Sequence, residues 1–311
     1  MTRREILLSP LASVAPQNLA ERLAGVYGQT LTDCVYTQTF ALLGRWRMGQ
    51  TRAVEALLEP FLDGRQDSLA KPTASHYSGH LVFPLLDRDH RAQALFRRAA
   101  EMASRSPLDN QMSDSVFMVC PLLAMAGMAD RAATHFEKMQ ALCERADGLW
   151  RHSPLADVAW GRGNAFPLLG LAMTLRAAPA KNELRGPFGS LAAALLKHQQ
   201  PDGMWRQVID QRRAWPEYSC TAMIAAALHI GVIHRWLPEG GFSRAIEKAW
   251  QAVERRTRVD GVVEGVCEST GKMPDLDAYL NRKSITGLDP RGGGMALFAA
   301  TELMMKAPPR E

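Results

Sequence analysis

The chain lacks the long apolar run that a membrane-spanning helix requires, because no stretch of its 311 residues approaches the roughly 18 apolar residues needed. Its five cysteines are widely spaced and form no CxxC pair, so the sequence predicts no metal site and favours reduced thiols in the core. The formal charge of +5 comes from scattered arginine pairs rather than a basic run with interleaved aromatics, which argues against nucleic-acid binding. These absences favour a soluble protein of a reducing, cytoplasmic compartment.

The first residues carry a partial signal-peptide pattern. Two arginines at positions 3 and 4 precede the apolar residues 6–8 and the small residues 13–15. Glu5 and Pro10 interrupt this pattern, and Pro16 would follow the cleavage point. We therefore expect residues 1–15 to form a loosely ordered N-terminal segment of a cytoplasmic protein, with secretion as the alternative.

Runs of β-branched residues are also scarce. Ala, Leu, Met, Glu and Arg fill long stretches instead, which is typical of helices. Apolar residues recur with helical period between Gly, Pro and Asp residues, as in Phe40, Leu43 and Trp46. The pattern predicts about a dozen helices, over residues 16–26, 33–48, 52–63, 74–86, 90–104, 113–127, 129–146, 162–176, 183–198, 217–236, 241–258 and 291–307.

A weak internal repeat suggests how these helices are arranged. The stretch Asp-Gly-Leu-Trp-Arg at 147–151 recurs as Asp-Gly-Met-Trp-Arg at 202–206 and fades to Asp-Gly-Val-Val at 260–263. The spacing of about 55 residues accommodates two helices and a loop. Six such hairpins predict one all-α domain over residues 1–311, closed into a toroid of inner and outer helices. The loops at 150–152, 160–166, 205 and 267–272 would then share one rim.

The most distinctive stretch is Trp-Gly-Arg-Gly-Asn-Ala-Phe at 160–166, which leads into the apolar residues 168–175. Trp160 offers a flat face for a sugar ring, and Arg162 and Asn164 offer donors for carboxylate and hydroxyl oxygens. The alternative is a capped helix start with a structural arginine. Spacing alone does not decide between these interpretations.

Asp114 directly precedes another strongly apolar helix. Its carboxyl group could cap that helix, which is the interpretation that the residues alone favour. A partly buried carboxyl facing the rim could instead serve in acid/base chemistry.

Residues 113–118, 148–152, 160–164 and 202–208, taken in this order, resemble the unsaturated glucuronyl and rhamnogalacturonyl hydrolases, glycoside hydrolase families 88 and 105. The resemblance extends over about residues 30–306 and implies an (α/α)6 barrel. It also implies hydrolysis of a small anionic oligosaccharide whose non-reducing end is a 4,5-unsaturated uronic acid left by a polysaccharide lyase. In such a reaction an Asp protonates C4 and assists the addition of water at C5. The resemblance implies no metal or organic cofactor, and it leaves the oligomeric state open.

By position, the resemblance makes Asp114 the catalytic acid and base. It places His152, Trp160 and Arg162 around the unsaturated sugar, with Arg162 on the carboxylate and Trp160 on the ring. The remaining candidates for substrate binding are Tyr36, His76, Asn164, Phe166 and Trp205. For Asn164, a structural role in orienting the loop is the alternative.

The chain also departs from the family pattern. Family members usually carry a second Asp in the stretch that corresponds to residues 75–80, where this chain offers His76 or His80 as replacements or as ordinary packed histidines. Ala165 and Phe166 stand where Gly and Trp are common. The alternatives are therefore a saturated β-glucuronidase or sugar epimerase on the same barrel, or a non-catalytic sugar-binding homologue.

Overall fold

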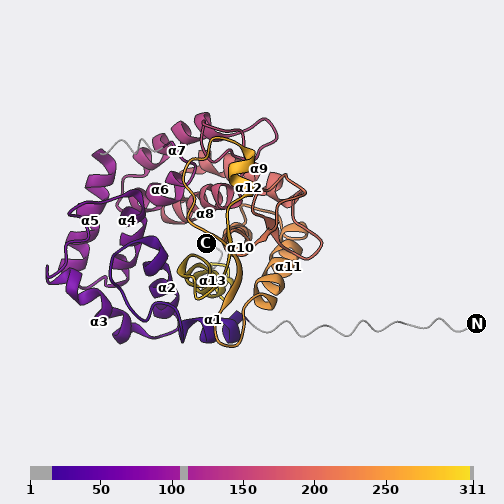
Figure 1. Cartoon of the computed structure of the whole chain (residues 1–311). Coiled ribbons are helices and arrows are strands. Elements are labelled where there is room, and N and C mark those ends of the chain that lie inside the picture. Colours follow the sequence, from indigo (N-terminus) through magenta and orange to yellow (C-terminus); the bar gives the residue numbers. More distant parts are fainter. Residues whose placement is uncertain (1–15, 106–110, 309–311) are drawn as a thin grey trace, which may run out of the picture.

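The computed structural model describes residues 16–105 and 111–308, so the expectation for residues 1–15 falls outside the described residues. Within this part, six inner helices form a closed ring in which each packs against the next and the last returns to the first (Figure 1). In ring order they are α2 (Tyr36–Arg47), α4 (Ala74–Gly79), α6 (Ser115–Met125), α8 (Gly161–Ala177), α10 (Tyr218–Ile233) and α13 (Pro290–Leu303).

A second layer of helices surrounds this ring. Its members are α1 (Pro16–Ala24), α3 (Thr51–Leu62), α5 (His90–Arg105), α7 (Ala129–Cys143), α9 (Arg185–Leu196) and α11 (Gly241–Arg255). The smaller elements are the 3-10 helices η1 (His80–Leu85) and η2 (Asn182–Leu184), the strands β1 (Trp205–Arg206), β2 (Pro216–Glu217), β3 (Val263–Cys267) and β4 (Ser284–Gly287), and helix α12 (Leu276–Leu280). Strands β1 and β2 pair antiparallel, as do β3 and β4. The described structure confirms the predicted all-α (α/α)6 barrel.

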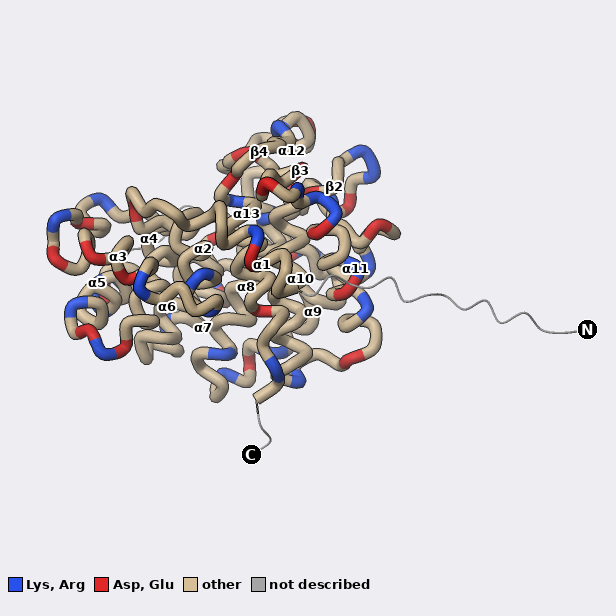
Figure 2. The backbone as a smooth tube through the Cα atoms, turned by 90° about the horizontal axis from the view of Figure 1, so that it is seen from below, with Lys and Arg blue, Asp and Glu red and all other residues tan. Residues whose placement is uncertain are grey.

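Burial explains why the chain sorts its helices into two layers. Every residue of α8 from Gly161 to Leu175 is buried, whereas α11 buries only one apolar stripe and presents charged residues to solvent. A glycine permits the close approach of two inner helices, because a Cβ at Gly170 would lie 2.7 Å from the backbone nitrogen of Phe117. The charged residues accordingly lie mainly on the periphery of the barrel (Figure 2).

One predicted helix is divided in two. Residues 74–86 form α4 and then η1, because Pro84 lies within η1 and has no N–H to continue an α-helix. The antiparallel strands and α12 were not among the predicted elements. The expectation of a single domain over 1–311 stays a prediction, since residues 1–15, 106–110 and 309–311 are not described.

The starts of the inner helices gather at one end of the barrel, which we call the mouth. The Ser113 amide donates to the His152 carbonyl at 2.9 Å, and the Gly161 amide donates to the Gln207 carbonyl at 2.7 Å. The first bond joins the loop before α6 to the loop before α8. The second joins the start of α8 to the loop after β1. The segment β3–α12–β4, residues 263–287, stands at the same end of the molecule and is here called the rim arm (Figure 2).

The part of the chain that the structure describes contains no helix long and apolar enough to span a membrane. Among the same residues, His, Cys, Asp and Glu form no group of three or more that could hold a metal ion.

Candidate functional site

Asp114 lies directly before α6, but its side chain makes no capping hydrogen bond to that helix. The interpretation of its carboxyl as a helix cap is therefore wrong. Its Oδ1 is buried without a hydrogen-bond partner and lies 3.4 Å from Nε2 of His152. Almost every buried polar atom in a protein has a partner, and Asp114 Oδ1 is the only carboxylate oxygen among the exceptions in the described residues.

His152 is fully buried beside Asp114. Its ring packs against Trp160, with ring centroids 4.5 Å apart, and its Nδ1 lies 2.8 Å from the hydroxyl oxygen of Tyr279. The backbone bond from Ser113 to the His152 carbonyl fixes the spacing of the two loops and so places Nε2 toward Asp114. The structure thus brings together Asp114, His152 and Trp160, as the sequence predicted.

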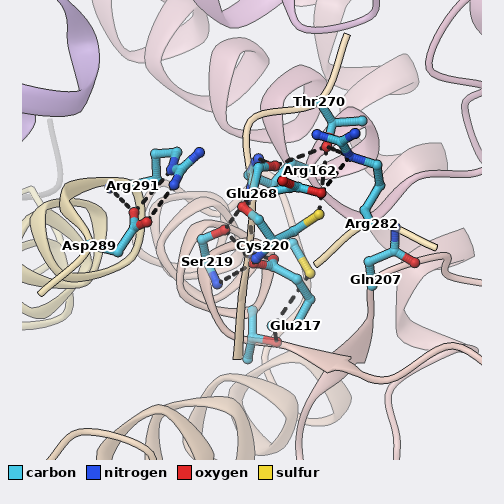
Figure 3. Close-up of polar contacts among 12 residues, drawn as sticks. Arg162, Gln207, Glu217, Ser219, Cys220, Glu268, Thr270, Arg282, Asp289 and Arg291 are labelled. Carbon is cyan, nitrogen blue, oxygen red and sulfur yellow. Dashed lines mark hydrogen bonds and ion pairs between the residues drawn. The ribbon is translucent and has the colours of Figure 1, made fainter. Parts of the chain in front are cut away.

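Arg162 lies in the first turn of α8, with its guanidinium carbon 4.7 Å from the centre of the Trp160 ring. Its Nη1 donates to the Cys267 carbonyl at 2.6 Å and to Ser219 Oγ at 3.3 Å, and its Nη2 donates to the Glu268 carbonyl at 2.9 Å (Figure 3). The guanidinium therefore ties the end of β3 to the inner helices. Its Nε is buried without a partner, and binding of a substrate carboxylate by Arg162 stays a prediction.

Glu217, which the sequence analysis did not single out, lies beneath Arg162 at the start of α10. Its Oε1 lies 3.7 Å from Arg162 Nη1 and accepts from the Ser219 amide, from Ser219 Oγ and from the Cys267 amide, while Oε2 accepts from the Cys220 amide. With both oxygens occupied, this carboxylate caps α10 and holds β3. The acidic residue at the start of the predicted helix 217–236 was the signal that could have identified it.

Two cysteines border this cluster. Burial raises the pKa of Cys220 well above its usual value, and Glu217 raises it further. Burial also raises the pKa of Cys267. Both thiols therefore remain protonated at neutral pH, so they are not activated nucleophiles. All five cysteines of the chain are free and buried, as predicted.

Two of the predicted binding residues are occupied within the protein. Asn164 accepts from the Trp150 amide through Oδ1 and donates through Nδ2 to the Trp150 and Trp160 carbonyls. Both of its amide hydrogens are used, so it orients the loop, as its structural alternative proposed. Trp205 is fully buried, and its Nε1 donates to the Leu195 carbonyl at 2.8 Å. The polar atoms of both side chains are thus used within the protein, and contact of either with a substrate stays a prediction.

Tyr36 and Phe166 form part of an aromatic cluster near the mouth. Their rings meet edge to face at 5.6 Å, and both rings also contact Phe117. Phe166 is buried, whereas Tyr36 is half-buried. Burial raises the pKa of Tyr36 to about 12, while Arg162 lowers it and Asp114 raises it.

His76 and His80 have polar partners other than Asp114. His76 Nδ1 accepts from the Thr73 amide at 3.0 Å, and its Nε2 lies 3.0 Å from Asp33 Oδ2. His80 is fully buried, and its Nε2 lies 2.9 Å from Ser68 Oγ. Burial lowers the pKa of His80 to about 4. His80 is therefore a packed histidine, and His76 pairs with Asp33; contact of His76 with a substrate stays a prediction.

The rim arm supplies a further residue that the sequence analysis missed. Tyr279, in α12, is fully buried and reaches His152 although the two residues are 127 positions apart in the chain. Gln207 Nε2 holds the Tyr279 carbonyl at 2.7 Å. A five-residue helix such as α12 has no periodic signal, so nothing in the sequence pointed to this contact.

Known proteins resemble this chain both in sequence and in fold. Residues 92–307 match the sequence profile described as Glycosyl Hydrolase Family 88. An unsaturated 3S-rhamnoglycuronyl hydrolase of Alteromonas sp. (strain LOR) is 29% identical over 155 residues, 48% of this chain and 36% of that protein. The unsaturated rhamnogalacturonyl hydrolase YesR of Bacillus subtilis (strain 168) is 28% identical over 160 residues, 49% of this chain and 43% of that protein. The chain thus spans less than half the length of these curated relatives.

Solved structures share the architecture. A family 105 glycoside hydrolase of C. acetobutylicum ATCC 824 superposes with a TM-score of 0.78 at 18% identity, covering 93% of this chain and 99% of that chain. A mutant unsaturated glucuronyl hydrolase of Streptococcus agalactiae gives a TM-score of 0.69 at 14% identity, covering 93% and 90% of the two chains. At these identities the likeness shows the barrel fold alone.

Proposed function

The chain belongs to glycosyl hydrolase family 88, and from that premise we propose that it hydrolyses small oligosaccharides ending in a 4,5-unsaturated uronic acid, with Asp114 as general acid and base. The names of the curated relatives support this substrate class, since both are hydrolases of unsaturated uronyl groups.

One observation carries the proposal: the Asp114 carboxyl at the mouth is buried, does not cap its helix and has an oxygen without a hydrogen-bond partner. A general acid must be able to give its proton to the substrate, so a carboxyl already committed to backbone amides could not act in this way. Glu217 illustrates the contrast, because four donors occupy its two oxygens.

The proposed chemistry is a hydration followed by a rearrangement. Asp114 gives its proton to C4 while water adds to C5, and the carboxylate then takes the proton that this water releases. The hemiketal at C5 opens, the bond from C1 to the leaving sugar breaks, and the saturated partner departs with a deoxy keto-uronate as the second product. Each proton given is recovered, so one carboxyl suffices for the cycle. The carboxylate-separation rule of ordinary glycosidases does not apply, since water attacks C5 rather than C1.

The charges of the mouth favour an anionic sugar. The inner helices α6, α8 and α10 begin there, and a helix N-terminus carries a partial positive charge. In our proposal the uronate lies between Asp114 and the Trp160–Arg162 pair, and the unpartnered Arg162 Nε is available to its carboxylate. The cytoplasm remains the proposed compartment, and five free cysteines fit its reducing conditions.

The test uses disaccharides generated by polysaccharide lyases and follows the loss of absorbance of the C4=C5 bond. We expect Asp114→Asn to lower kcat by about 10²- to 10⁴-fold, as loss of a general acid does. Asp130→Asn is the matched control, because Asp130 is 93% exposed on α7 and lies outside the mouth.

Other outcomes would replace the proposal. No turnover of any unsaturated uronide by the wild type refutes it, and equal turnover by Asp114→Asn refutes Asp114 as the catalyst. Turnover of saturated p-nitrophenyl glucuronide would instead indicate an ordinary glucuronidase. Saturable binding without turnover would indicate a sugar-binding homologue.

A further inference from the structure

The contact between the rim arm and His152 has a chemical consequence, because it determines which nitrogen of the histidine carries a proton. The Tyr279 hydroxyl lies 2.8 Å from His152 Nδ1, with the two rings edge to face at 5.7 Å. Both side chains are fully buried, so water cannot substitute for either partner. The second ring nitrogen, Nε2, lies 3.4 Å from Asp114 Oδ1.

A donor beside the Tyr279 oxygen sets the direction of this hydrogen bond. The Met273 amide donates to the Tyr279 hydroxyl oxygen at 3.3 Å. The phenol hydrogen is then directed to His152 Nδ1, which accepts it. Burial raises the pKa of Tyr279 to about 12, so the phenol keeps this hydrogen at any pH at which the protein is folded and active.

We propose that Tyr279 is a positioning residue that holds His152 in the tautomer with its proton on Nε2, directed at the Asp114 carboxylate. A neutral imidazole whose Nδ1 accepts a hydrogen bond must carry its proton on Nε2. Nε2–H then faces Oδ1, the carboxyl oxygen that has no other partner. The 3.4 Å separation is longer than a hydrogen bond, and such contacts commonly shorten when substrate binds.

The alternative tautomer would oppose catalysis. With its proton on Nδ1, the histidine would direct the lone pair of Nε2 at the ionised Asp114 carboxylate, the form that takes the proton from water, and these two acceptors repel each other. The carboxylate would then turn away from the position in which it meets the sugar. Tyr279 prevents this arrangement, because its oxygen already accepts from the Met273 amide and its hydrogen is directed at Nδ1.

The rim arm holds Tyr279 firmly in this position. Gln207 Nε2 donates to the Tyr279 carbonyl at 2.7 Å, and Arg162 holds the Cys267 and Glu268 carbonyls at the start of the arm (Figure 3). Gln207 and Arg162 therefore both hold the segment that carries Tyr279. This inference rests on the proposed function for its catalytic part, whereas the tautomer of His152 is a property of the protein alone.

The experiment records the two-bond ¹H–¹⁵N spectrum of histidine-labelled full-length protein, with His152→Gln used only to assign the signals. We expect the wild type to show a protonated Nε2 and an unprotonated Nδ1, and Tyr279→Phe to lose this pattern. In turnover assays, Tyr279→Phe should lower kcat about tenfold, the effect of one lost hydrogen bond, with KM changed less than twofold.

Tyr218→Phe is the matched control. Its hydroxyl makes a buried hydrogen bond of 2.7 Å to Thr257 Oγ1, but it does not contact His152. This variant should leave both the His152 signals and kcat unchanged, which separates a general loss of a buried hydroxyl from the specific effect.

Three results would overturn the inference. They are a wild-type His152 with its proton on Nδ1, a Tyr279→Phe variant with unchanged tautomer, or one with unchanged kcat in an active enzyme. The wild-type spectrum decides the first point even if the variant does not fold. If no unsaturated uronide is turned over, the proposed function fails while the spectrum still tests the link from Tyr279 to His152.

Discussion

Replacing Arg162 by alanine should release the rim arm from the barrel. The guanidinium donates to the Cys267 and Glu268 carbonyls at 2.6 and 2.9 Å and neutralises the buried carboxylate of Glu217, whose Oε1 lies 3.7 Å away. Removal of one member of a buried ion pair costs about 3–5 kcal/mol, because the remaining charge stays buried without its partner. We expect the lower end of this range, about 3 kcal/mol, since four hydrogen bonds still stabilise Glu217.

The assay is chemical denaturation combined with hydrogen exchange of the backbone amides. Arg162→Ala should lower the free energy of unfolding by that amount and speed exchange in residues 263–287 more than in the inner helices. Arg162→Lys should lose about half as much, because one ammonium group can replace the charge but not the forked donors.

Arg213→Ala is the control for this prediction. Its Nη2 lies 2.7 Å from Asp277 of the same arm, but both side chains are more than half exposed, so the pair contributes less than about 1 kcal/mol. If Arg162→Ala were no more destabilising than Arg213→Ala, the guanidinium would not hold the arm, and its contacts to the two carbonyls would be incidental.

Two further predictions concern the barrel itself. Gly170→Ala should destabilise the protein by about 1–3 kcal/mol, since the new methyl group would lie 2.7 Å from Phe117 backbone atoms. Gly189→Ala in α9 should instead stabilise it by about 0.5–1 kcal/mol, because nothing lies within 4 Å of the new methyl group. Thermal melts of the two variants compare these effects directly. Because burial lowers the pKa of His80 from 6.5 to about 4, the unfolded chain binds this proton first as the pH falls, so on the order of 3 kcal/mol of stability is lost between pH 6.5 and 4. Denaturation across this range should show a shallower decline for His80→Gln, and an equal decline would contradict the assignment.

The barrel was predictable because its signals are local and repeated. Helical periodicity located both layers within a few residues, as α8 at Gly161–Ala177 against a predicted 162–176 shows. The rim arm was not predictable in this way. Its strands are short, and β3 and β4 pair across the intervening α12. β3 is also held by bonds of Cys267 to Glu217 and Arg162, which lie 50 and 105 positions away in the chain.

The sequence predicted which loops form the site, but not which partners their side chains bond to. Asp114, His152 and Trp160 meet as the order of the motifs implied. The polar atoms of Asn164 and Trp205, however, form hydrogen bonds with backbone groups. Sequence identifies which side chains carry donors, but only the fold shows whether a nearby carbonyl already accepts from them. The motif at residues 160–166 is buried, so most of its donors bond to other groups of the protein. Its polar residues therefore mainly stabilise the loops.

The missing second Asp can be assessed in the same terms. His80 is bonded to Ser68 and His76 to Asp33, so neither offers a carboxyl or a free base to Asp114. Glu217 is fully occupied by donors.

An ordinary glycosidase would fail without a second carboxyl, because its acid and its base or nucleophile must act at once on opposite sides of C1. Hydration of a double bond has no such requirement, since the proton given to C4 and the proton taken from water can pass through one carboxyl. In the proposed hydration this carboxyl is Asp114, whose buried Oδ1 lies 3.4 Å from His152 Nε2 and makes no hydrogen bond.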